Sequence, residues 1–287
     1  MNIKAFLRSI IKREEFRNKP LKVIYNVLKW QILSRFRDKV RYDWHSNLIV
    51  ECEKSDTGFT GNIYYGLMER YETYFFIKVL NKDEFFLDIG ANLGSYTLLL
   101  NRLCGAKCIA VEPSSKTFKK LSKNVELNNL KNIKLFNFAA GEKNKTVFFT
   151  KSLGPENSIV ENSIVDHEMV IQKALDDIID VDISFMKIDT EGNELRVLEG
   201  AKNILKSESI MVIMCEINEK SKTFGINEKS LIDYLKVFGL EMCVYKNGTL
   251  VPGYNHQPNK FFVKMEKLEI INQRLLDNQY RLKEVEF

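Results

Sequence analysis

At 287 residues, the chain is long enough for one domain with a substantial core and extensions, and two full domains are not expected. With 45% hydrophobic and 28% charged residues and no apolar run of bilayer-spanning length, its composition is not that of an integral membrane protein. The net charge of +5 is uneven, because residues 1–45 hold twelve Lys or Arg and four acids, a local balance of +8. A generally basic surface for nucleic acid is therefore not indicated.

Residues 1–41 contain two amphipathic helical patterns, separated by a break at Pro20. Apolar residues of the second pattern gather on one face, with Lys and Arg on much of the other: Leu21, Ile24, Val27, Leu28, Ile32 and Phe36. Such helices can lie in a membrane interface, with their cations at anionic headgroups. They can equally pack on the rest of the chain or form a contact between two copies, and the pattern leaves these alternatives open.

The segment 43–66 is polar and rich in turn residues, which predicts a short hairpin or gate ahead of the core. Helical spacing resumes over 66–80, and Glu72 lies on this helix. A glutamate there can face a ligand or simply the solvent.

The stretch 85–96 predicts a buried strand over 85–89, a glycine turn and a helix start that includes Tyr96. Gly90 lies where the chain must turn tightly, and Gly94 lies where the new helix must pass close to the strand or to a ligand. Ligands of open α/β sheets bind outside the carboxyl ends of the strands. We therefore expect a ligand above this turn.

The spacing of the turn favours S-adenosylmethionine over a dinucleotide. A dinucleotide fingerprint needs Gly-x-Gly-x-x-Gly to hold a pyrophosphate, whereas Asn92 stands at the position of the middle glycine. Asp88, at the strand end, suits the amino group of an amino-acid-bearing cofactor and would repel a pyrophosphate. Glu112 follows the next expected strand, 107–111, where its carboxylate can accept hydrogen bonds from both ribose hydroxyls.

Strands and helices then alternate in a βαβαβ pattern, with a third strand expected over 133–138 and helices over 95–103 and 114–129. Beyond the third strand, the small residues Ala139 and Ala140 leave room for a flat adenine ring.

The segment 146–172 interrupts the alternation. Its part from Ser152 to Val165 has the composition of a loop and contains Glu-Asn-Ser-Ile-Val twice, at 156–160 and 161–165. This repeat is too short for a solenoid unit, and we interpret the segment as a mobile lid over the substrate site. His167, just beyond it, is either a base or a surface residue.

Two further strands are expected over 184–189 and 210–217, and they bring three acids to adjacent strand ends: Asp189, Glu191 and Glu216. A helix over 228–238 follows. The segments 241–245 and 261–263 predict a closing antiparallel pair, with Asn247-Gly248 as a turn between them. The tail is expected to be a helix that packs on the core.

Three segments, in this order and spacing, resemble the FkbM-type S-adenosylmethionine-dependent methyltransferases: Asp88-Ile-Gly-Ala-Asn-Leu-Gly, Val111-Glu112-Pro113 and Lys187-Ile-Asp-Thr-Glu-Gly-Asn-Glu194. The resemblance implies a Rossmann-like class I methyltransferase fold, an α/β fold with a mostly parallel seven-stranded sheet and an antiparallel closing strand. It also implies methylation of a hydroxyl of a sugar, glycolipid or polyketide. Finally, it places Glu72 near the methionyl end of the cofactor, Pro113 beside the cofactor, and the adenine near Ala139 and Ala140.

We expect three parts in the chain: a basic helical extension (1–45), a methyltransferase domain (46–264) and a helical tail (265–287). An odd number of cysteines, with no metal-type spacing and no recognisable signal peptide, favours a reducing, cytoplasmic setting, with contact at the inner face of the membrane left open. Cys104 and Cys108 are interpreted as core residues.

Methyl transfer to a sugar hydroxyl needs a base, and Asp189 is our candidate, with Glu191 and Glu216 beside it. The same three acids could instead hold a divalent cation that binds a sugar diol, although no metal-ligand set is assigned. A nucleic-acid acceptor is not expected, because Lys187-Ile-Asp-Thr-Glu-Gly stands where an Asn-Pro-Pro-Tyr type tetrad would grip a flipped base. The expected partner is a sugar or glycan acceptor, and a homo-oligomer is left open.

Overall fold

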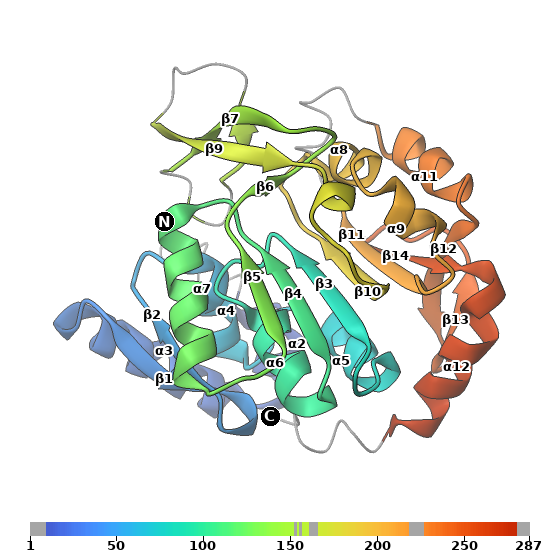
Figure 1. Ribbon diagram of the computed structural model, residues 1–287. Coiled ribbons are helices and arrows are strands. Elements are labelled where there is room, and N and C mark those ends of the chain that lie inside the picture. The colour runs from blue at the N-terminus through green and yellow to red at the C-terminus, as the bar shows by residue number, and fades with distance from the viewer. Residues whose placement is uncertain (1–9, 152–153, 155–156, 161–165, 218–226, 280–287) are drawn as a thin grey trace.

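The computed structural model describes residues 10–151, 154, 157–160, 166–217 and 227–279, and its centre is a twisted sheet with helices on both faces (Figure 1). The sheet has eight strands in the order β13-β12-β14-β11-β10-β3-β4-β5. Their bounds are β3 (Phe85–Ile89), β4 (Lys107–Val111), β5 (Ile133–Phe136), β10 (Ile183–Ile188), β11 (Val212–Glu216), β12 (Leu240–Lys246), β13 (Thr249–Pro252) and β14 (Asn259–Lys264). Neighbouring strands from β5 to β11 are parallel, which confirms the expected α/β fold.

The far edge of the sheet differs in one respect from the expected seven strands. β14 lies antiparallel between β11 and β12, so the closing antiparallel pair is confirmed. The turn at Asn247 and Gly248, both with positive φ, does not join β12 to β14. Instead it forms a tight hairpin with β13, an eighth strand at the edge of the sheet.

Helices cover both faces of the sheet because its central strands are buried on both sides. Phe86 and Phe185 contribute to one hydrophobic cluster and Leu87 and Met186 to the other, as alternation along a strand requires. The first face carries α4 (Thr57–Tyr65), α5 (Arg70–Val79), α6 (Ser95–Cys104), α7 (Ser115–Leu127) and α12 (Leu268–Asp277), and the second carries α8 (Glu194–Glu199), α9 (Lys202–Lys206) and α11 (Glu228–Lys236).

The two glycines of the first turn are required by close packing. Gly90 has a φ of +78°, and a Cβ there would lie 1.8 Å from the carbonyl oxygen of Asp189 at the end of the neighbouring strand. Gly94 has a φ of +90°, and a Cβ there would lie 2.6 Å from Leu121 of α7. The close approach at Gly94 is therefore to a neighbouring helix, whereas Gly90 allows two strand ends to meet.

The segment 146–172 interrupts the alternation as expected, and its described parts belong to a second sheet in the order β6-β9-β7-β8, in which the short strand β8 lies inside the expected loop 152–165. Its strands are β6 (Ala139–Ala140), β7 (Lys145–Thr150), β8 (Ile159–Val160) and β9 (His167–Lys173). Residues Val147, Phe149 and Val170 give this sheet its own small core. The strands were missed because they lie outside the βα alternation and β7 and β9 pair with each other at a distance along the chain. Residues 152–153, 155–156 and 161–165, with most of the repeat, are outside the described residues, so the lid stays a prediction.

The N-terminal region packs on the first face of the main sheet. A hairpin of β1 (Val40–Asp43) and β2 (Ile49–Cys52) overlaps only the start of the segment 43–66, where a short hairpin or gate was expected, and residues 57–65 form helix α4. α2 (Glu14–Asn18) and α3 (Pro20–Phe36) meet at the expected Pro20 break. Val23 and Trp30 of α3 lie in the same cluster as Leu275 of α12, so both ends of the described chain share one core. The three-part division of the chain stays a prediction.

Two further expectations concern single features. All five cysteines are buried thiols, as expected for Cys104 and Cys108. The tail helix packs through Ile271 and Leu275, which confirms its packing face.

Over the residues that the structure describes, no helix has both the length and the apolarity to cross a membrane.

Candidate functional site

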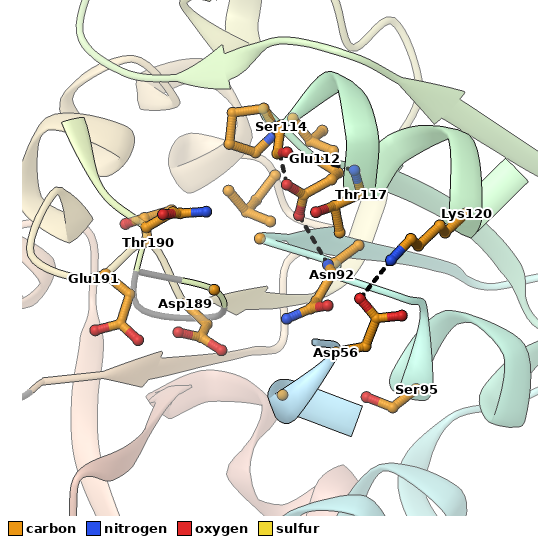
Figure 2. Close-up of a pocket in the computed structure, with 18 of the residues that line it drawn as sticks. Asp56, Asn92, Ser95, Glu112, Ser114, Thr117, Lys120, Asp189, Thr190 and Glu191 are labelled. Atoms are coloured by element: carbon orange, nitrogen blue, oxygen red, sulfur yellow. Dashed lines mark hydrogen bonds and ion pairs between the residues drawn. The ribbon is translucent and has the colours of Figure 1, made fainter. Parts of the chain in front are cut away.

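A cavity of about 560 Å³ opens at the carboxyl ends of β3, β4 and β10. The second sheet lies across this end of the main sheet and supplies Phe149, Ile159 and Glu168 to the cavity wall (Figure 1). Figure 2 shows Glu112 and Asn92 on one side of the cavity and Asp189 and Glu191 on the other. Acidic residues that follow strands far apart in the sequence, Glu112 after β4 and Asp189 after β10, thus line one cavity.

Nine of the thirteen residues assigned from the sequence line this cavity: Gly90, Asn92, Tyr96, Glu112, Pro113, Ala139, Ala140, Asp189 and Glu191. The other four, Glu72, Asp88, Gly94 and Glu216, do not line it. Proximity does not test the roles, which stay predictions.

Glu112 is held in place by the backbone on both sides of it. Its Oε2 accepts from the backbone N–H of Asn92 at 2.9 Å, and its Oε1 accepts from the backbone N–H of Ser114 at 2.9 Å (Figure 2). Burial raises its pKa to about 7, although these two donors favour the carboxylate. Each oxygen keeps further acceptor capacity, so the side chain is fixed and still able to bind hydroxyl groups.

Asp88 lies beneath the cavity and is almost fully buried. Its Oδ2 accepts from the hydroxyl of Thr97 at 2.6 Å, and its Oδ1 is 4.0 Å from Nζ of Lys187. Burial raises its pKa, and the charge of Lys187 opposes that shift. Asp88 thus has a direct hydrogen bond from Thr97 and a more distant cationic partner in Lys187, which itself lines the cavity.

Glu69, and not Glu72, forms the cavity wall at the start of α5. The hydroxyl of Tyr96 donates to Oε2 of Glu69 at 2.8 Å, and Nδ2 of Asn259 donates to its Oε1 at 2.9 Å. Asn259 is also 3.4 Å from Glu72, which lies behind Glu69. Three residues, nearly one helical turn, separate the two glutamates, so the sequence pattern could not distinguish which of them faces the ligand.

Three acids and one lysine form the charged centre of the site. Asp189, Glu191 and Glu216 offer carboxylate oxygens that lie within 4.8 Å of one another. Nζ of Lys187 is 3.0 Å from Oδ2 of Asp189, and Lys187 is only 4% exposed. Burial lowers the pKa of Lys187, but Asp189 and Asp88 outweigh it and raise that pKa above its usual range. Lys187 is thus a permanent cation that favours the carboxylate form of Asp189.

The surroundings of Glu216 favour its protonated form. Burial, and then the charge of Asp189 and a hydrogen bond with it, raise the pKa of Glu216 to about 9. A neutral Glu216 can donate to the Asp189 carboxylate without adding a negative charge to the cluster.

This protonation predicts that the protein loses stability as the pH rises. The unfolded-state pKa of Glu216 is near 4.5 and the folded-state pKa is about 9. Its contribution is therefore fully present below pH 4.5 and is lost as the pH rises through about 9, with Glu112 acting in the same direction up to about 7. We expect the melting temperature to fall by several degrees between pH 5 and pH 9, to be followed by differential scanning fluorimetry.

Glu216→Gln stays neutral and should flatten this pH dependence. The matched control is Glu126→Gln, because the side chain of Glu126 is 65% exposed on α7. An equally steep fall in the Glu216→Gln variant would show that Glu216 is ionised in the folded protein.

The structure also gives the positions of Glu194, the last residue of the third sequence motif, and of His167. Glu194 begins α8, where its Oε1 accepts from the backbone N–H of Gly192 at 2.8 Å and from the hydroxyl of Thr190 at 3.2 Å. It stabilises the helix start, as a carboxylate there should. His167 packs edge-on against Phe148, with ring centroids 4.7 Å apart, and does not line the cavity.

Sequence reasoning missed the wall that the N-terminal region contributes. Trp44, Asp56 and Asn62 all line the cavity. Nζ of Lys120 on α7 pairs with Oδ1 of Asp56 at 2.5 Å and with Glu53 at 2.9 Å, which ties this wall to the main domain (Figure 2). No local pattern signals these contacts. The Ser114 cap of α7, by contrast, could have been found from its position before the helix.

Comparison with known proteins identifies the family of this chain. A family model described as methyltransferase FkbM domain matches residues 88–280. The protein "Methyltransferase 1" of Beauveria bassiana (strain ARSEF 2860) is 25% identical over 145 residues, which are 41% of this chain and 58% of that protein.

Among solved structures, methyltransferase FkbM from Methylobacillus flagellatus KT is similar over 84% of this chain and 59% of its own, with 16% identity and a TM-score of 0.46. A putative methyltransferase from Streptococcus mutans in complex with SAH is similar over 67% of this chain and 94% of its own, with 14% identity and a TM-score of 0.42. The chain thus spans somewhat more than half the length of the Beauveria and Methylobacillus proteins.

Proposed function

The chain belongs to the FkbM methyltransferase domain family, and from this premise we propose that it transfers a methyl group from S-adenosylmethionine to a hydroxyl of a sugar or glycan. Membership confirms the resemblance inferred from the three sequence motifs. The observation that carries the proposal is that Glu112 and Asp189, from different strands, face one cavity of about 560 Å³. That size suits a cofactor together with part of an acceptor.

The residues on the Glu112 side fit the cofactor. The backbone of Asn92 and Ser114 fixes the Glu112 carboxylate, which can still accept from two vicinal ribose hydroxyls. The small side chains of Ala139 and Ala140 leave room in the cavity for a flat base, and Pro113 lines the same cavity. When bound, the cofactor supplies an activated methyl group, so the protein has to bind, orient and exclude water.

The residues on the Asp189 side fit the removal of a proton. A sugar hydroxyl is a weak nucleophile, and its proton must pass to a base as the new bond forms. Asp189 is that base in our proposal, because Lys187 at 3.0 Å favours its carboxylate form. Glu216 is the neutral donor that holds Asp189 in position, and Glu191 lies beside them at the cavity wall.

Polar residues of the wall support a hydroxyl-rich acceptor. Asn62 of α4, Asn157 of a loop and Glu168 of β9 line the cavity, and such groups bind sugar hydroxyls. A cell-surface polysaccharide or glycolipid precursor is the acceptor class that we propose. The alternatives are another small-molecule or lipid acceptor, or a binding domain without activity. We do not propose a nucleic-acid acceptor.

A divalent cation at the three acids is the second candidate role of this cluster. Their oxygens lie within 4.8 Å of one another, as a shared cation would require. Nζ of Lys187, 3.0 Å from Oδ2 of Asp189, already neutralises part of the negative charge of the cluster, which favours proton transfer over metal binding. Activity lost with a chelator and restored by Mg²⁺ or Mn²⁺ would favour the cation.

The test of the proposed function is binding followed by transfer. We expect isothermal titration calorimetry to detect S-adenosylmethionine and not NAD. Incubation with methyl-labelled cofactor and fractionated cell glycans should then transfer label to a glycan fraction, and alkali should not release it, because methyl ethers resist hydrolysis whereas esters do not. Absence of cofactor binding would favour a nonenzymatic domain. Label in a protein or nucleic-acid fraction would overturn the acceptor class.

A further inference from the structure

Helix α3 carries an exposed apolar face. Six bulky apolar side chains are exposed, by 43% at Ile24 to 85% at Phe36: Leu21, Ile24, Tyr25, Leu28, Ile32 and Phe36. Leu21, Tyr25, Leu28 and Ile32 follow the i, i+4, i+7, i+11 spacing of one helical stripe. We name these six residues the α3 stripe. The sequence pattern had suggested this face as the apolar one, and the structure turns it outward.

The opposite face of α3 fixes this orientation. Val23 and Trp30 are fully buried against the core. Nδ2 of Asn26 donates to the carbonyl oxygen of Tyr64 at 3.4 Å, and Nε2 of Gln31 donates to the hydroxyl of Tyr64 at 2.9 Å. Turning the stripe inward would expose Trp30 and break these bonds. The stripe is therefore a stable feature of the surface.

Positive charge surrounds the stripe, and acids are absent from it. The segment 19–37 contains three lysines and two arginines and has no Asp or Glu. Lys29 lies over the rings of Tyr25 and Tyr42, at 5.8 and 5.6 Å from their centroids. The two acids of the preceding helix α2 are engaged by other residues of the protein. Glu14 accepts a hydrogen bond from the hydroxyl of Tyr71, and Oε1 of Glu15 lies 3.7 Å from Nε of Arg70.

We propose that the α3 stripe docks on an anionic lipid surface. An apolar stripe flanked by cations matches the acyl boundary and the headgroups of such a surface. A second copy of this chain fits less well, because two such faces would bring lysines and arginines of like charge together. The docking does not depend on the proposed reaction.

One helix, α4, separates α3 from the cavity. α3 packs on α4, and α4 supplies Thr57, Gly58 and Asn62 to the cavity wall.

The experiment is cosedimentation of the full chain with vesicles. We expect the protein to sediment with equal parts phosphatidylcholine and phosphatidylglycerol, and not with phosphatidylcholine alone. Binding should fall as salt rises past about 0.1 M, where the screening length is about 10 Å. Deleting residues 1–41 is not a clean test, because the deletion removes the buried Val23 and Trp30.

Point variants separate docking from folding. Leu28→Gln with Ile32→Gln should weaken vesicle binding by about tenfold or more, since both side chains are 57% exposed and ready to enter the lipid. Lys19→Gln with Arg35→Gln should weaken it by about fivefold per cation. The matched control is Ile270→Gln with Leu276→Gln, a second exposed apolar pair on helix α12, which should bind as the unmodified protein does.

Three outcomes would overturn the proposal. The unmodified protein could stay in the supernatant with anionic vesicles. Alternatively, the Leu28→Gln with Ile32→Gln variant and the Lys19→Gln with Arg35→Gln variant could both sediment as the unmodified protein does, with unchanged melting curves. The third is a lipid-free dimer, measured by light scattering, that the Leu28→Gln and Ile32→Gln pair converts to a monomer, which would make the stripe a contact between copies.

Discussion

Asp189→Asn is expected to lower the turnover of methyl transfer by about 10²–10⁴ and to leave the fold and most of the cofactor affinity intact. An amide has the shape of the carboxylate but cannot take the proton of the acceptor hydroxyl. Its oxygen can still accept from Nζ of Lys187, which lies 3.0 Å from Oδ2 of Asp189. The loss should therefore appear in kcat, measured with labelled cofactor under saturating acceptor.

The companion variant Glu216→Gln sharpens this test. Because burial and Asp189 raise the pKa of Glu216 to about 9, the side chain is already neutral at pH 7, and a neutral amide replaces it with little loss. Turnover should fall by less than about tenfold. Near-normal turnover in Asp189→Asn with a large loss in Glu216→Gln would reverse the two roles. A large loss in both, together with chelator sensitivity, would favour the cation.

Glu112→Ala is expected to weaken S-adenosylmethionine binding by about 1–3 kcal/mol, because charge-assisted hydrogen bonds to the ribose are lost. Calorimetric Kd values measure this directly. The substitution also leaves the N–H groups of Asn92 and Ser114 without their acceptor, so a melting curve must accompany it.

Glu112→Gln is the matched control for that second effect. Its amide oxygen retains one acceptor for the backbone, whereas its NH₂ group cannot accept from a ribose hydroxyl. An affinity loss in both variants, with a melting temperature preserved in Glu112→Gln, would assign the effect to the cofactor. An unchanged Kd in both would remove Glu112 from the site.

The burial of the acids connects these two predictions. Glu112 and Glu216 both have pKa values raised by burial, and Asp189 contributes to both shifts. Because the folded protein favours the protonated form of both groups, its free energy of unfolding falls as the pH rises. Sites that perform proton chemistry commonly carry such shifts, which gives the cluster at Asp189 a physical signature of function beyond its motif.

Local patterns in the sequence were enough to predict the βαβ core. The strand bounds Phe85–Ile89 and Lys107–Val111 agree with the expectation, because an uninterrupted apolar run followed by a glycine turn permits few other structures. The ends of these two strands place Gly90, Asn92 and Glu112 at one cavity, since parallel strands all end at one edge of the sheet.

Contacts between distant segments decided the rest. β7 and β9 form a sheet only because each supplies the other's hydrogen bonds, and Lys120 meets Asp56 only after α7 and α4 are packed. A helical pattern in the sequence identifies the apolar face of a helix, but it does not determine which face packs against the core. In α3, burial of Trp30 and Val23 turned the more apolar face to the outside. The sequence thus determined the family, the cofactor-side turn and the acid-bearing strand ends. Tertiary packing decided which glutamate faces the cavity, which acids have their pKa raised by burial and which side of α3 is exposed.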